Sequence, residues 1–223
     1  MKEIAKKYRH GFADRRFVIA LVASLVLVAA SLIANYYAAT YATGRESNFV
    51  TDIILSNIPV FDVDNYFVYG PIIFWAIIAA ILLIDPKKIP FTLKSIALFV
   101  LVRSIFITLT HIGPYPDHTV LDIAGPEWLR QLSSTSNFFL FSSGGDLFFS
   151  GHTGLPFLMA LVFWRHHFIR ALCLIASIFF AVVVLLGHLH YSIDVLAAFF
   201  ITYSVYHIAL RLFKNDRRLF LGT

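Results

Sequence analysis

Two short segments, far apart in the sequence, hold the residue types that nucleophilic and acid–base chemistry needs. The first, GGDLFFSGHT, covers residues 144–153, and the second, HYSID, covers residues 190–194. An imidazole can attack an electrophile or move a proton near neutral pH, and a neighbouring carboxylate fixes its tautomer. The surrounding sequence is mostly apolar. Ionisable groups are costly in such surroundings, so the two segments predict one shared functional site.

The second segment contains a possible nucleophile and its partner. His190 and Asp194 are four residues apart, and they would share a face if one helix included both. A carboxylate on one imidazole nitrogen raises the basicity of the other, which makes His190 a candidate nucleophile on phosphorus that forms a phosphohistidine. The structural alternative is a polar turn in which the two residues only cap a helix.

The first segment supplies a candidate proton carrier. His152 can protonate a leaving oxygen and later deprotonate an incoming one. Here too capping is the alternative, with Ser150 or Thr153 as the capping residue. Asp146 either orients His152, contacts a headgroup cation, or is an exposed loop acid.

The remaining predicted site residues would bind a substrate anion. Glycines permit close approach of the backbone to an anion, as expected for Gly145 and Gly151. Arg103 lies in an apolar run, where it needs an acidic partner or a substrate phosphate. Ser150 and Tyr191 complete the predicted substrate-binding set.

A metal site is a weaker interpretation of the same residues. His152, His188, His190 and Asp194 are of types that bind zinc, but their spacing matches no familiar zinc motif, and His-Glu-x-x-His is absent. We therefore expect no metal and no cofactor. We expect His188 either to be structural or to support the neighbouring His190.

Composition predicts an all-α polytopic membrane protein. Of the 223 residues, 59% are hydrophobic and only 14% are charged, whereas soluble domains are about 25% charged. The net charge of +5 comes from basic residues that flank apolar runs, which indicates membrane topology and not nucleic-acid binding. We predict a tail at 1–16, a membrane domain at 17–212 and a tail at 213–223. The six expected spans are 17–37, 68–84, 91–110, 150–168, 171–186 and 192–212.

The basic residues also predict orientation. One side of the expected bundle carries nearly all of them, and the other side has only Arg45 and Arg130. The positive-inside rule then puts both termini in the cytoplasm, in what we expect to be the plasma (inner) membrane. The fourth and sixth helices start on the outer side. His152 and His190 would thus lie at two outward-facing helix N-termini, where the helix dipole favours anions.

These motifs carry a resemblance to a known family. The run from Gly145 to Thr153 resembles the third conserved motif of the sphingomyelin-synthase-like branch of the type-2 phosphatidic acid phosphatase (PAP2) superfamily. The segment that begins at His190 resembles the fourth motif. The resemblance extends in order over roughly residues 50–210, although only the two motifs are specific. It implies a PAP2-like six-helix bundle that works without metal.

The resemblance also implies roles and an activity. His190 would be the nucleophile, Asp194 its partner and His152 the acid and base. Gly144 stands where the family usually has Cys, and Val184 stands where the phosphatase branch has Arg. That branch's Lys-x6-Arg-Pro motif is missing as well. The implied activity is transfer of a phospho-headgroup from a membrane phospholipid to a lipid alcohol, either ceramide or diacylglycerol.

The sequence is compatible with three other functions. Water as the acceptor would make the protein a PAP2-type lipid phosphatase or a phospholipase-C-like hydrolase. An intramembrane serine protease would also place Ser and His at related helix positions, but Phe148 stands where such enzymes have Gly, and His190 precedes its helix. A non-catalytic lipid-binding membrane protein would not need the full set of His152, His190 and Asp194.

Overall fold

The computed structural model describes residues 2–116 and 147–222, and every regular element in these ranges is helical. The predicted all-α class is therefore confirmed. The elements are α1 (Lys2–Ala13), α2 (Arg15–Thr43), η1 (Leu55–Asn57), α3 (Asp64–Ile84), η2 (Pro86–Lys88), α4 (Ile89–Leu109), α6 (Gly151–Val162), α7 (His167–Leu186), α8 (Ser192–Leu212) and α9 (Lys214–Leu221).

Five of the described helical segments are long and apolar enough to cross a membrane: α2, α3, η2 with α4, α7 and α8. The sixth predicted span, α6, has only 12 residues. At 1.5 Å per residue it is about 18 Å long, which is shorter than the hydrocarbon core of about 30 Å. Most side chains of α6 are buried, so the neighbouring helices enclose it. The predicted membrane bundle is confirmed, with one short segment at its centre.

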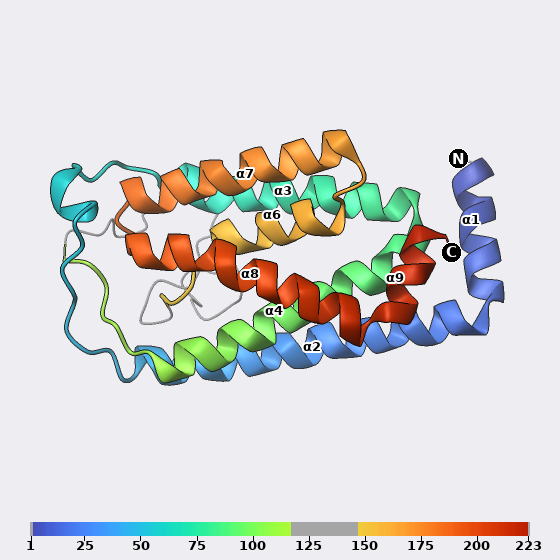
Figure 1. The fold of residues 1–223 in the computed structure, drawn as a ribbon, viewed down its shortest axis with the longest axis horizontal. Helices are drawn as coiled ribbons and strands as arrows, with labels where there is room; N and C mark the ends of the chain where they lie inside the picture. Colours follow the sequence, from blue (N-terminus) through green and yellow to red (C-terminus); the bar gives the residue numbers. More distant parts are fainter. Residues whose placement is uncertain (1, 117–146, 223) are drawn as a thin grey trace, which may run out of the picture.

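The long helices follow the long axis of the molecule and alternate in direction (Figure 1). Helix α6 packs against α7, α8 and α4, whereas α2 packs mainly against α4. The loops that precede α3 and α8 lie at one end of the bundle, and α1 and α9 lie at the other. The starts of α6 and α8 both face the first of these ends.

Small side chains explain the close packing of α2 on α4. Ser24, Ser31 and Ala38 recur every seven residues along α2, and all three are buried, as is Phe17 one heptad earlier. Small residues let two membrane helices approach closely without a bulky side chain between them. The two serine hydroxyls donate to backbone carbonyls one turn back, at 2.7 and 2.8 Å, so their burial leaves no unpaired donor.

The predicted boundary between the fourth and fifth spans is wrong by several residues. Helix α6 ends at Val162 and not at residue 168, and α7 begins at His167 and not at residue 171. The chain turns between them, with His166 in an extended conformation before α7. Arg170 fixes this turn, because its Nη1 donates to the Trp164 carbonyl at 3.3 Å and its guanidinium lies 4.7 Å from the Trp164 ring centre.

The predicted tails contain short helices. Helix α1 ends at Ala13, and Asp14 caps the start of α2 by accepting a hydrogen bond from the Arg16 N–H at 2.9 Å. Helix α2 starts two residues before the predicted span and continues to Thr43, six residues beyond it. The C-terminal segment forms α9, which packs on α4 and η2.

Gly154 allows α6 to lie against two neighbours at once. A Cβ atom at this position would come within 2.8 Å of the Phe99 ring on α4 and 2.9 Å of Thr202 Oγ1 on α8. Both neighbours are fully buried, so neither can move aside freely. A side chain at position 154 would push α6 away from α4 and α8.

We therefore expect Gly154→Ala to destabilise the protein by about 1–3 kcal/mol, since overpacking strains a filled interior. The measurement is the thermal unfolding midpoint of the purified protein in detergent. Gly44→Ala is the matched control, because a Cβ there meets the carbonyl oxygens of Thr40 and Tyr41 at ordinary distances of 3.5 and 3.7 Å. Equal midpoints for the two variants would contradict the packing argument.

Candidate active site

The start of α8 brings an imidazole to a buried carboxylate. His190 lies just before the helix, so the two residues do not share a helical face. Instead, Nδ1 of His190 lies 3.5 Å from Oδ2 of Asp194, which is in the first turn. Asp194 is fully buried, and its Oδ2 also accepts the Tyr191 N–H at 3.0 Å. Asp194 thus caps the helix and faces the imidazole with the same oxygen.

The two nitrogens of the His190 ring have different surroundings. Its Nδ1 is buried against Asp194, which leaves Nε2 as the nitrogen available to a ligand. The separation of 3.5 Å is at the outer limit of a hydrogen bond, and such contacts commonly tighten when substrate binds. A proton held on Nδ1 by the carboxylate keeps the lone pair on Nε2, which is the form that a nucleophile requires.

The start of α6 positions the second histidine. Ser150 is the N-cap residue, and its Oγ accepts the Thr153 N–H at 3.4 Å. The His152 ring stacks on Phe67 of α3, with 4.1 Å between ring centres, and meets Phe180 of α7 edge-on at 6.3 Å. Two buried aromatic rings from different helices therefore fix the orientation of His152.

A backbone hydrogen bond joins the two helix starts. The Ser150 N–H donates to the Asp194 carbonyl at 3.2 Å. One turn into α6, the Thr153 carbonyl accepts the Ser177 hydroxyl of α7 at 2.8 Å. Because both helix starts are fixed to each other, His152 lies close enough to His190 for their charges to interact.

The side chain of Arg103 on α4 extends to the start of α6. Its charge also interacts with His152. The arginine Nε donates to the Phe149 carbonyl at 3.1 Å, and a Cβ built on Gly151 would lie 3.7 Å from the same Nε. The structure thus brings together a guanidinium, two imidazoles and the N-termini of α6 and α8. That arrangement is suited to an anion, since helix N-termini and guanidinium groups both bind phosphate.

The structure does not place the other predicted site residues beside His152, His190 and Arg103 as substrate-binding groups. Tyr191 is buried, and its hydroxyl donates to the Gly113 carbonyl at 2.8 Å, so it supports the loop next to the site. Gly145 and Asp146 lie outside the described residues. His188 is buried in a left-handed backbone conformation, with φ of 52°, and its ring meets Tyr115 edge-on at 5.2 Å. In the described ranges, no three His, Cys, Asp or Glu side chains cluster as metal ligands would.

Sequence reasoning missed Asp52, which ties the 44–63 connection to α8. Its Oδ2 accepts both the backbone N–H and the hydroxyl of Ser192, at 2.7 and 2.8 Å. Its Oδ1 accepts the N–H groups of Ile54 and Leu55 at 2.9 and 3.2 Å. No local sequence signal marks this contact, because the two partners are 140 positions apart.

Comparison with known families supports the relationship suggested by the motifs. The family model described as PAP2 superfamily C-terminal matches residues 143–210, which include both histidine segments and helices α6, α7 and α8. The match supports a relationship to the PAP2 superfamily over this part of the chain. The comparison with curated proteins and the comparison with solved structures found no match.

We expect Asp52→Asn to lower the free energy of unfolding by about 2 kcal/mol at neutral pH, because an amide has one acceptor oxygen in place of two. Burial raises the pKa of the Asp52 carboxyl, but the hydrogen bonds from Ser192, Leu55 and Ile54 outweigh it, and the pKa lies below the ordinary 3.8. A lowered pKa in the folded state stabilises the protein above pH 3.8, and this contribution is lost as the pH falls through the folded-state value.

The measurement is the unfolding midpoint of the wild type and of Asp52→Asn across a pH series. The difference between the two midpoints should be largest at neutral pH and should become smaller below pH 3.8. Asp62→Asn is the control, because Asp62 lies exposed in the same connection, and within the described ranges its Oδ1 accepts only the Asp64 N–H. A difference between wild type and Asp52→Asn that stays constant down to acid pH would contradict the proposed role of the charge.

Proposed function

We propose that this protein is a membrane phospholipid headgroup transferase that works through a phosphohistidine on His190. The observation that carries the proposal is the joined pair of helix starts, which brings His152 close enough to His190 and to Arg103 for their charges to interact. The match to the PAP2 superfamily model supports a lipid phosphatase or phosphotransferase. The transferase mechanism and its residues are our inference.

In the first step, Nε2 of His190 attacks the phosphorus of a phospholipid, and a P–N bond forms as the bond to the lipid alkoxide breaks. His152 gives its proton to the departing alkoxide, which leaves as diacylglycerol or another lipid alcohol. Asp194 stabilises the imidazolium that forms, because its carboxylate faces Nδ1. The Arg103 guanidinium offsets the negative charge of the phosphoryl oxygens.

In the second step, an acceptor alcohol such as ceramide or diacylglycerol enters. His152, now neutral, removes the hydroxyl proton, and the alkoxide attacks phosphorus. The P–N bond breaks, a new phosphate ester forms, and His190 and His152 return to their starting protonation states.

Two features favour a lipid acceptor over water. The walls beside His152 are the apolar rings of Phe67 and Phe180, each only 3% exposed, and an apolar wall disfavours bulk water. Val184, at the position where the phosphatase branch has Arg, is fully buried and packs among apolar side chains of α3 and α8. It supplies no second cation for a doubly charged phosphate monoester.

Orientation is part of the same proposal. Lys87, Lys88, Arg165 and Arg217 lie around one cavity at the end of the bundle that holds α1 and α9. The positive-inside rule then supports a cytoplasmic location for that end, with the candidate active site toward the outer side of the plasma membrane.

The test uses the purified full chain in detergent–lipid micelles with a mixed phospholipid extract. Fluorescent ceramide and fluorescent diacylglycerol are supplied separately, and products are resolved by chromatography and mass spectrometry. Free phosphate and phosphocholine are assayed in parallel. A new fluorescent phospholipid would identify both donor and acceptor. A water-soluble phosphate product without a new lipid would overturn transfer in favour of hydrolysis.

We expect His190→Ala to abolish transfer and His152→Ala to lower kcat by about 10²–10⁴-fold, the usual contribution of a general acid and base. His207→Ala is the matched control, since His207 is an exposed histidine of α8 whose Nδ1 lies 2.9 Å from the Tyr203 carbonyl of its own helix. Full transfer by His190→Ala would exclude the phosphohistidine mechanism.

We expect Asp194→Asn to lower kcat by about 10³-fold or more while donor binding changes little. The amide oxygen can still accept the Tyr191 N–H and cap α8, but it cannot stabilise an imidazolium. The measurement is the separate determination of kcat and KM together with the unfolding midpoint. An unchanged kcat would reduce Asp194 to a capping residue.

A further inference from the structure

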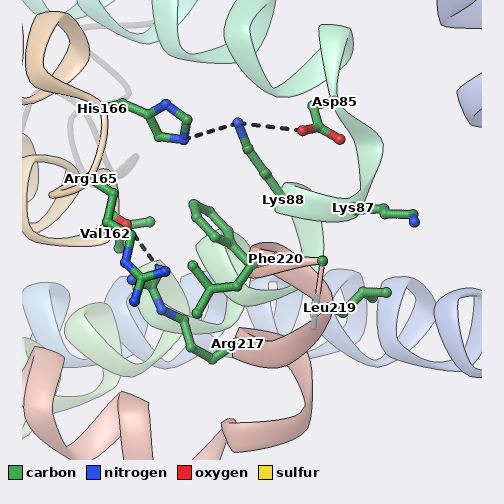
Figure 2. A pocket seen from close by; sticks show the side chains of 11 residues that line it. Asp85, Lys87, Lys88, Val162, Arg165, His166, Arg217, Leu219 and Phe220 are labelled. Atoms are coloured by element: carbon green, nitrogen blue, oxygen red, sulfur yellow. Dashed lines mark hydrogen bonds and ion pairs between the residues drawn. The ribbon is translucent and has the colours of Figure 1, made fainter.

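A second cluster of basic side chains lies at the opposite end of the bundle from His152 and His190. It surrounds a cavity of about 360 Å³ between η2, the turn that joins α6 to α7, and α9. Figure 2 shows Lys88, Arg165, His166 and Arg217 around this cavity, with the Phe220 ring among them. The four side chains come from three elements that are distant in the sequence, so the fold assembles the cluster.

Negative charge at the cavity is small. Among its described lining residues, the only carboxylate is that of Asp85, which lies 3.4 Å from Lys88 Nζ. Asp216 is next to Arg217 in sequence, but both of its oxygens bind Lys94 at 2.8 and 2.9 Å. The charges on Arg165 and Arg217 are therefore not balanced within the described part of the chain.

Arg217 is held in place by contacts that leave its charge uncompensated. Its Nη1 donates to the Val162 carbonyl at the end of α6, at 3.0 Å. Its guanidinium lies 5.0 Å from the Phe91 ring centre and 4.7 Å from that of Phe220. Burial lowers the pKa of Arg217, and the nearby cation of Arg165 lowers it further, while Tyr206 opposes the shift.

His166 and Lys88 form the other side of the cavity. Lys88 Nζ lies 3.3 Å from His166 Nε2, between that ring and Asp85 (Figure 2). Burial lowers the pKa of His166, and so does Lys88, with Asp85 opposing and Arg217 adding to the decrease. A neutral His166 accepts the Lys88 N–H, and the positive charge of the cluster is carried by Lys88, Arg165 and Arg217.

Membrane topology alone does not account for this arrangement. The positive-inside rule favours lysine and arginine near one end of the bundle, but it does not require them to converge. Cations that converge on a cavity repel one another, and a bound anion removes that cost. Guanidinium groups pair with phosphate through two hydrogen bonds, and the Phe220 ring offers an apolar surface beside it.

We propose that this cavity binds a phosphate-bearing anion at the membrane face opposite the candidate active site. Two sources carry the same chemistry: the headgroup of an anionic phospholipid in the adjacent leaflet, and a free phosphate in the aqueous phase. Binding joins η2, the 163–166 turn and α9, so occupancy stabilises the fold by linkage.

The test measures the unfolding midpoint of the purified full chain in detergent at constant ionic strength. One arm adds short-chain phosphatidic acid, a second adds inorganic phosphate, and a third adds zwitterionic short-chain phosphatidylcholine. We expect the midpoint to rise with phosphatidic acid concentration and not with phosphatidylcholine. A rise with inorganic phosphate as well means that the phosphate group suffices, and a rise with phosphatidic acid alone identifies a lipid headgroup.

Variants locate the binding. Arg165→Gln removes an exposed cation that has no hydrogen bond or ion pair among the described residues, so its fold should persist while its apparent Kd for phosphatidic acid rises about tenfold or more. Arg218→Gln is the matched control, because it removes an exposed arginine of α9 that does not line the cavity. Its response should equal that of the wild type.

The same lipid can also enter the candidate active site, so Arg103→Gln is measured beside these variants. The proposal requires that the response persist in Arg103→Gln and weaken in Arg165→Gln. A response lost in Arg103→Gln and kept in Arg165→Gln would assign the binding to the active site and overturn the proposal. Equal responses of Arg165→Gln and Arg218→Gln, or no response to either anion, would overturn it too.

Discussion

The candidate site depends on one backbone hydrogen bond, from the Ser150 N–H to the Asp194 carbonyl. Each histidine segment begins a different helix, and α7 separates these helices in the chain. A contact between main-chain atoms fixes the distance between the two helix starts whatever the side chains do. It also supplies a partner for one of the free N–H groups at the start of α6. The imidazoles then need only local support, which Asp194 gives to His190 and Phe67 gives to His152.

Helix α6 lies among three of the other helices. It is too short to cross the hydrocarbon core, yet it packs against α4, α7 and α8. The absence of a side chain at Gly154 permits this close packing, and the Ser177 hydroxyl ties α7 to the Thr153 carbonyl. Its first turn presents His152, and its last residue, Val162, accepts a hydrogen bond from Arg217. One rigid element of three turns thus connects the candidate active site to the cationic cavity.

Most of the architecture could be predicted from local sequence, because a long apolar run and a basic flank are both local features. The start of α8 at Ser192 and the end of α3 at Ile84 were predicted in this way. The end of α6 was not, because Phe163 and Trp164 continue the apolar run, and the turn is held by contacts within it such as that of Arg170 with Trp164. Asp52 was missed for the same reason: its role exists only when Ser192, 140 positions away, is folded against it. The cationic cavity is likewise formed by residues from three distant segments. Taken separately, the basic residues of each segment predict only membrane orientation.

The length of α2 has a consequence for how the molecule sits in a bilayer. Its 29 residues extend about 43 Å, which exceeds the hydrocarbon thickness by roughly 13 Å. Tyr36, Tyr37 and Tyr41 are exposed near its C-terminal end, and tyrosines favour the headgroup level. If Arg16 marks one boundary, the helix reaches the other about 20 residues on, which is the position of Tyr36. The last two turns of α2 then project among the headgroups and carry the following connection, with Asp52, clear of the acyl chains.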